Sequence, residues 1–123
     1  MKDFEKSLVI QVISEPDTLI ASRQWDVLTE GVFISELYAA SASGTRAALL
    51  RYLPGAAVAA HRHPGYEHIL ILQGSQQDGD VIYGVGDLVI HKPETSHDLI
   101  SKDGCLALGI WEKPVEFIDA SNA

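Results

Sequence analysis

The sequence predicts a single all-β domain, a sandwich or barrel built from short strands. Two observations lead to this class. Short apolar runs are separated by clusters of Gly, Pro, Asp and Ser, and these turn signals recur about every ten residues. The 123 residues are 46% hydrophobic and 21% charged, a composition that suits one globular core and not two.

The expected strands follow one another along most of the chain. The breaks between them read SASG, PG, HPG, QQDG, VG, PETS and KDG, and they contain the residues that favour chain reversal. The strands are expected at LVIQVI (8–13), GVFISELY (31–38), RAALLRYL (46–53), AVAAHRH (57–63), YEHILIL (66–72), DVIYG (80–84), DLVIHK (87–92), HDLIS (97–101) and CLALGIWE (105–112).

Two segments invite a helical interpretation. Residues 15–29 suit a helix, but Pro16 restricts its start, so we expect a turn or two at most. Residues 47–60 are rich in alanine, which favours helices. Pro54 and Gly55 split that run, however, so we expect strands on either side of them.

The charge balance bears on partners and location. The formal net charge is -8, and an acidic surface repels phosphate backbones and anionic lipids, so neither nucleic acid nor a membrane is expected as a partner. The apolar run LVIQVI is too short for a secretory signal or a membrane span. The lone Cys105 cannot form an internal disulfide, and we expect a cytoplasmic protein.

The stretch HRHPGYEHILILQG carries the main functional signal. On a strand His61 and His63 point to the same face, about 7 Å apart at a rise of roughly 3.3 Å per residue. Pro64-Gly65 then turns the chain, so Glu67 is expected to begin an antiparallel partner strand close to His63. A fourth ligand is expected from His97, if a second hairpin lies opposite the first. Three neutral histidines and one carboxylate suit Zn, Fe, Mn, Ni or Cu better than Ca or Mg.

Other residues near this stretch have competing interpretations. His91 is either a hydrogen-bonding group beside the cavity or a strand residue satisfied by backbone partners. Tyr66 either rims the pocket or packs on the strand, and Arg51 either points inward toward an anionic ligand or lies on the surface. His68 should point away from Glu67. Ile69, Ile71 and Leu49 are expected to face inward and make the pocket apolar, while Cys105, Trp25 and Trp111 are expected to be core or interface residues.

The same stretch resembles a known family motif. Residues 55–74 match the first cupin motif, G-x5-H-x-H-x3-E-x6-G, at every fixed position. The second motif, usually G-x5-P-x-G-x2-H-x3-N, is shorter here: Pro93 is followed by ETS and His97, and Ser101 replaces the asparagine. This variant resembles the ChrR-like cupins, as do LLRYLPG (49–55), the DGD turn (78–80) and GCLALGIWEKPVEF (104–117). The likeness covers roughly residues 23–118.

The resemblance implies a cupin barrel over 23–118, after an N-terminal strand and lead-in (1–22) and before a flexible tail (119–123). It also implies one metal held by His61, His63, Glu67 and His97. ChrR-like regulators carry a separate N-terminal zinc module that binds a sigma factor. The segment that precedes the resemblance here contains no cysteine or histidine, so we do not expect sigma-factor binding through such a module.

Two functions from different classes remain open. One is a non-catalytic metal-binding module, a ligand or oxidative-stress sensor that acts through a protein partner in trans. A tetrahedral zinc site with four protein ligands would be closed and would suit it. The other is a dioxygenase that cleaves a C–C bond of a small β-diketone or hydroxyketone, since six-coordinate Fe, Mn or Ni would keep two open positions. We expect zinc, a small-molecule ligand and a homodimer, because short barrels commonly bury exposed strand edges.

Overall fold

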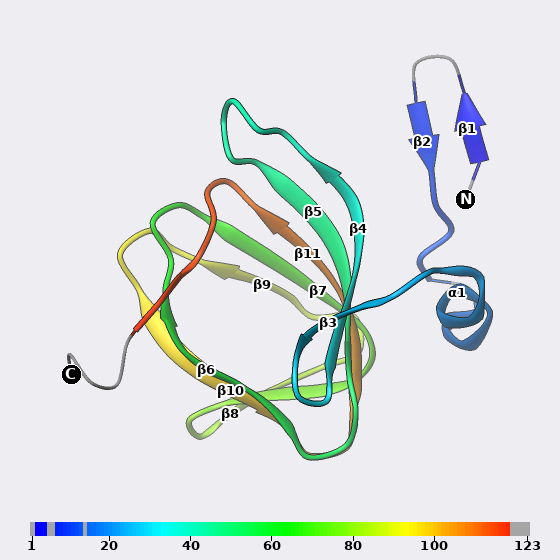
Figure 1. Cartoon of the computed structure of the whole chain (residues 1–123). Coiled ribbons are helices and arrows are strands. Elements are labelled where there is room, and N and C mark those ends of the chain that lie inside the picture. Colours follow the sequence, from blue (N-terminus) through cyan, green and yellow to red (C-terminus); the bar gives the residue numbers. More distant parts are fainter. Residues whose placement is uncertain (1, 5–6, 14, 119–123) are drawn as a thin grey trace.

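A computed structural model describes residues 2–4, 7–13 and 15–118, and it confirms the all-β prediction (Figure 1). Most of the strands form one ten-stranded sheet, and the first two form a separate two-stranded hairpin. In the described part no helix has the length and apolar character needed to cross a membrane. The elements are β1 (Lys2–Phe4), β2 (Ser7–Val9), α1 (Pro16–Ser22), β3 (Asp26–Thr29), β4 (Val32–Ala39), β5 (Arg46–Tyr52), β6 (Ala56–Arg62), β7 (Glu67–Asp78), β8 (Val81–Gly84), β9 (Leu88–His91), β10 (Ser96–Ser101), β11 (Cys105–Trp111) and β12 (Glu116–Phe117).

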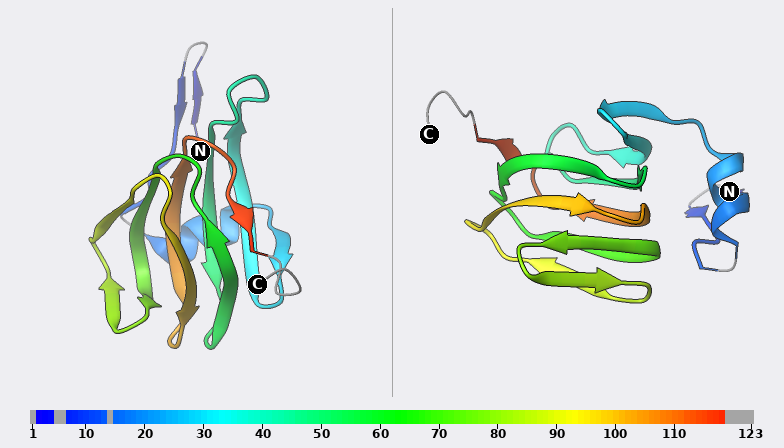
Figure 2. Two further views of the ribbon diagram at one scale, coloured as in Figure 1. Left: turned by 90° about the vertical axis from the view of Figure 1, so that its left-hand side faces the viewer. Right: turned by 90° about the horizontal axis from the view of Figure 1, so that it is seen from below.

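The large sheet curls on itself because the long strand β7 belongs to both of its halves. The strand order is β12-β6-β10-β7-β11-β5-β4-β3, and β8 and β9 also pair with β7. The first half of β7 pairs with β11 and β9, and its second half pairs with β8 and β10. The two halves of the sheet therefore face each other as two layers around an interior, as Figures 1 and 2 show.

The passage of β7 from one layer to the other occurs at Gly74. This residue has a φ of 73°, and a Cβ there would overlap the carbonyl oxygen of Gly104. Glycine alone accepts both the left-handed conformation and the close backbone approach. The sequence prediction ended this strand at Leu72, but the strand bends at Gly74 and continues to Asp78. The chain turns at Gly79 instead.

Two apolar clusters lie on opposite faces of the sheet. The inner cluster includes Ile34, Leu50, Val58, Ile69 and Ile71, which come from both layers and confirm that Ile69 and Ile71 face inward. The outer cluster consists of Leu19, Leu49, Leu72 and Leu106, with Ile20 and Trp25 packed against it.

The two faces of β5 follow from the alternation of its side chains. Leu50 and Tyr52 point into the barrel, whereas Leu49 points outward, where α1 covers it. The expectation that Leu49 lines the interior is therefore wrong. The hydrophobic pattern alone does not show which face of a strand is covered by a helix and which by another strand.

Several element predictions are confirmed and some are incomplete. The helix is confirmed over the short range Pro16–Ser22, and the last four residues of the predicted helical segment form β3. The expected strand over 8–13 forms only as β2, and β1, β3 and β12 were not predicted. The predicted flexible tail, 119–123, lies outside the described residues.

The bend in β7 can be tested by Gly74→Ala. We expect it to lower the free energy of unfolding by more than the roughly 1–3 kcal/mol of left-handed strain alone, because the Cβ also overlaps Gly104. Gly79→Ala is the control, since Gly79 has a φ of 59° but open space around its Cα. Equal losses for the two variants in urea unfolding would show that the close approach at Gly74 is unimportant.

Candidate metal site

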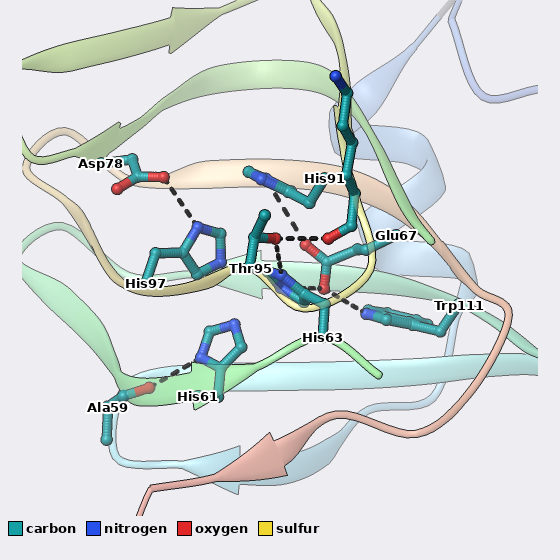
Figure 3. A network of polar contacts seen from close by, with 10 residues as sticks. Ala59, His61, His63, Glu67, Asp78, His91, Thr95, His97 and Trp111 are labelled. Atoms are coloured by element: carbon teal, nitrogen blue, oxygen red, sulfur yellow. Dashed lines mark hydrogen bonds and ion pairs between the residues drawn. The ribbon is translucent and has the colours of Figure 1, made fainter. Parts of the chain in front are cut away.

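Four histidines and Glu67 converge inside the barrel from four different strands or their ends (Figure 3). The donor atoms of His61, His63 and His97 all lie within 4.8 Å of one another, and so do those of Glu67, His91 and His97. His97 belongs to both groups. The residues predicted as ligands are thus brought together, and His91 lies among them.

Strand pairing places these side chains. His61 on β6 is the cross-strand partner of His97 on β10, and Glu67 on β7 is the partner of His91 on β9. Directly paired residues of an antiparallel sheet point to the same face. The predicted β-hairpin between the strands of His63 and Glu67 is wrong, because β10 lies between β6 and β7. His97 therefore stands beside His61 and not on an opposing hairpin.

Hydrogen bonds fix the tautomers of two histidines directly. The Nδ1 atom of His61 lies 2.8 Å from the carbonyl oxygen of Ala59, and that of His97 lies 2.8 Å from Oδ2 of Asp78. Carbonyl and carboxylate oxygens only accept, so each Nδ1 carries the proton and donates it. The lone pair of each ring is left on Nε2, the atom that would bind a metal.

The tautomer of His63 is fixed through Thr95. The Thr95 hydroxyl donates to the carbonyl oxygen of Lys92 at 2.6 Å, so its oxygen accepts from Nδ1 of His63 at 3.1 Å. The backbone of the same turn holds His63 in place, since the His63 N–H donates to the Thr95 carbonyl at 2.8 Å. The lone pair of His63 is therefore also on Nε2.

Three of these imidazole nitrogens are buried without a partner. Within the described residues, the Nε2 atoms of His63, His91 and His97 make no hydrogen bond. Leaving one such group unsatisfied costs about 1–3 kcal/mol, and a bound metal would satisfy them. Burial lowers the pKa of His61 and lowers that of His91 to about 4, so both rings are neutral at pH 7. The donor set fits a transition metal.

Glu67 supplies the negative charge of the cluster. Burial disfavours its ionisation, but the adjacent His63 imidazole and the hydrogen bond from Trp111 outweigh burial and hold the pKa of Glu67 below its usual value. Trp111 donates its indole N–H to Oε2 at 2.6 Å, and Nε2 of His63 lies 3.4 Å from the same oxygen. The carboxylate is thus ionised and held in a fixed orientation within the cluster.

A cavity of about 240 Å³ adjoins His61 and Glu67. A cavity of roughly 150 Å³ holds benzene in another protein, so this one has room for a small organic molecule. Arg46 is at the cavity but forms an ion pair with Glu36 at 2.9 Å. The remaining walls are mainly apolar, and they include Leu28, Ile34, Leu50, Val58, Ile69, Leu99, Val115 and Phe117.

The other singled-out residues lie away from this cavity. Tyr66 is 44% exposed and lines a hollow on the outer surface with His68, so it does not rim the pocket. Arg51 follows the outward parity of Leu49 and lines a different hollow, so its inward alternative is wrong. Cys105 is a core residue as expected, and burial raises the pKa of its thiol to about 12.

Sequence reasoning missed the residues that orient the candidate ligands. Trp111 was expected to be a core or interface residue, and neither Asp78 nor Thr95 was singled out. Asp78 lies in the DGD turn, which carried a turn signal, and Thr95 lies in the PETS turn between His91 and His97. An acceptor near a candidate ligand is the available signal, but strand pairing decides which acceptor reaches which ring.

The curled antiparallel sheet and its inward histidine–glutamate cluster define a cupin. The chain belongs to the family described as the ChrR Cupin-like domain, whose model matches residues 17–111. The anti-sigma-E factor ChrR of Cereibacter sphaeroides is 35% identical over 77 residues, which are 60% of this chain and 36% of that protein. The present chain therefore spans only about a third of this curated relative.

Solved structures agree with this assignment. The complex of Rhodobacter sphaeroides SigE with the anti-sigma ChrR matches at a TM-score of 0.66 and 30% identity, over 73% of this chain and 50% of that one. An acetylacetone dioxygenase from Acinetobacter johnsonii matches at a TM-score of 0.75 over 100% of this chain and 87% of that one. Its identity is 12%, so this second likeness concerns the fold alone.

Proposed function

We propose that this cupin binds one divalent transition metal through His61, His63, Glu67 and His97 and acts in the cytoplasm as a ligand-sensing regulatory module. The observation that carries the proposal is the set of buried Nε2 atoms with no partner, next to an ionised carboxylate. We propose zinc as the metal, with iron, manganese or nickel as alternatives. The metal supplies a positive centre that binds electron-pair donors.

The residues around the ligands support a pre-organised site. Ala59, Thr95 and Asp78 accept the Nδ1 protons of His61, His63 and His97, so the three rings need no reorientation to bind a cation. Three neutral imidazoles and one carboxylate give a net charge of +1 with a divalent ion. With zinc, four protein ligands make a closed tetrahedral site, which is the kind that serves structure or sensing.

The regulatory part of the proposal derives from the family. The curated relative is an anti-sigma factor, and a solved relative is in complex with SigE. We propose that the present domain likewise signals through a protein partner in trans. The net charge of -8 makes direct binding to nucleic acid or to an anionic membrane unfavourable, which supports a protein as the partner.

The sensed molecule is proposed to occupy the cavity beside His61 and Glu67. Its walls are mainly apolar, and its cation Arg46 is already paired with Glu36. These features favour a small, largely apolar molecule over a strongly anionic one. Leu50 and Ile69 would contact its apolar part, while the metal ligands lie at its polar end.

A second candidate function, a dioxygenase acting on a small diketone or hydroxyketone, is favoured by the same cavity. A substrate held there would have its oxygens next to the metal ligands and its carbon skeleton against apolar walls. This function requires a six-coordinate metal such as iron, manganese or nickel. Within the protein, the buried side chains of Leu50 and Ile69 would keep water from the reacting end.

We also propose a homodimer formed through the outer face of β7, β9 and β11. Leu88 and Ile90 are 58% and 51% exposed on β9, which among the described strands pairs with β7 alone. Ile110 on β11 is 38% exposed and shares their surface through His68. A second copy is the proposed occupant, because an exposed strand edge beside apolar side chains can pair with its own copy across a two-fold axis.

The metal proposal is tested by elemental analysis of untagged protein as purified. We expect about one zinc per chain in the wild type and loss of the metal in His97→Ala, which removes a donor common to both donor groups. His68→Ala is the matched control and should keep its metal, because His68 points away from the site. Stoichiometric metal in His97→Ala would contradict the proposed ligand set.

The dioxygenase alternative makes a different prediction for iron-loaded protein. Steady oxygen uptake with a panel of β-diketones, abolished in His61→Ala, is expected of the enzyme. The sensor predicts no turnover, and instead a diketone or another apolar molecule would raise the unfolding temperature without consuming oxygen. Iron, manganese or nickel in the purified protein, together with turnover, would favour the dioxygenase function and contradict the sensor function.

The dimer is tested by measuring the mass in solution by light scattering at micromolar concentration. The wild type is expected at twice the 13.4 kDa of one chain, and Ile90→Lys at the mass of one chain. Ile82→Lys, at a 64% exposed position on β8 away from the proposed interface, should remain dimeric. A wild-type protein that is monomeric under these conditions would contradict the proposal.

A further inference from the structure

We propose that His91 is a fifth protein ligand of the metal and binds it through Nε2. This inference depends on the proposed metal site, and it concerns a histidine at a position that neither sequence motif specifies as a ligand. It is argued from the position of His91, from its distance to Glu67 and from its unpartnered nitrogen.

The position of His91 is set by β9. It is the cross-strand partner of Glu67, so the two side chains point into the barrel together. The ring centroid of His91 lies 4.4 Å from that of His97 and 5.1 Å from that of His63. The side chain is 11% exposed, and Figure 3 shows its ring directed toward Glu67.

The distance between His91 and Glu67 distinguishes a ligand from a simple hydrogen-bond partner. Nε2 of His91 lies 3.7 Å from Oε1 of Glu67, which is too long for a hydrogen bond. Two ligands of one metal at about 2.0–2.2 Å from it lie up to roughly 4.3 Å apart. A separation of 3.7 Å therefore suits two atoms that share a cation.

The two oxygens of Glu67 have different roles in this arrangement. Oε2 accepts the indole N–H of Trp111 at 2.6 Å, whereas Oε1 faces His91. The donor atoms of Glu67, His91 and His97 all lie within 4.8 Å of one another. Glu67 thus shares a compact three-donor group with His91, and the buried Nε2 of His91 has no hydrogen-bond partner among the described residues.

A fifth ligand changes what the site can accommodate. Four protein ligands close a tetrahedral ion, but five favour a five- or six-coordinate one and leave at most one position of an octahedron open. A small molecule could then bind through a single atom. A chelating diketone would need two positions and would have to displace a protein ligand, so a stable fifth ligand favours sensing over the dioxygenase reaction.

Cobalt(II) added to the metal-depleted full chain tests the assignment, because its visible bands are weak at coordination number five or six and intense at four. We expect wild type to bind one Co(II) with weak bands. His91→Ala and His91→Gln should bind at least about tenfold more weakly and with more intense bands. His68→Ala, the matched control on the outer face of β7, should match the wild type in Co(II) affinity and in the intensity of the visible bands.

Three other outcomes would overturn the inference. An unchanged affinity and spectrum in both His91 variants would show that His91 is not a ligand. A weaker affinity with an unchanged spectrum would show that His91 acts only by positioning Glu67. Failure of the wild type to bind Co(II) would overturn the metal site itself, which separates that failure from the failure of His91. His91→Gln keeps a polar side chain of similar size, and circular dichroism of each metal-free variant verifies that it is folded.

Discussion

The insertion of β10 between β6 and β7 is the constraint on which the rest of the site depends. This pairing sets His97 beside His61 and carries the preceding turn past His63, where Thr95 bonds both its backbone and its ring. Without this pairing, the candidate ligands of the first motif and His97 of the second motif would not meet at one site. The same insertion forces β7 to serve both layers, which is why its bend at Gly74 is needed.

The oxygens that accept hydrogen bonds from the Nδ1 atoms determine where the unpartnered Nε2 atoms of the cluster lie. An oxygen at the periphery of the cluster accepts the Nδ1 proton of each of His61, His63 and His97. The lone pair of each ring is therefore on Nε2, which points into the cluster. Buried nitrogens without partners destabilise the metal-free fold. A bound metal would pair with these nitrogens and recover that free energy, so metal binding and folding are thermodynamically coupled.

Much of this molecule could be predicted from its sequence, and the remainder depends on long-range pairing. Alternating side chains and turn residues predict most of the strands, and the spacing of His61, His63 and Glu67 identifies the candidate site. The bend of β7 was missed because Gly74 normally suggests a strand end. Arg51 and Leu49 were ambiguous because alternation separates two faces without saying which one is covered by α1. The roles of Trp111 and Asp78 depend on which strands are neighbours, and no local pattern encodes that.

The contact between Trp111 and Glu67 makes the fluorescence of Trp111 sensitive to the charge of the cluster. The indole N–H of Trp111 donates to a carboxylate within the cluster, so any change in the charge at Glu67 alters the electric field across that ring. The other tryptophan, Trp25, packs against the outer cluster and donates to the carbonyl of Ile20 beneath α1. A change in the emission of Trp111 on occupancy of the site would therefore be measured against a constant contribution from Trp25, without any added dye.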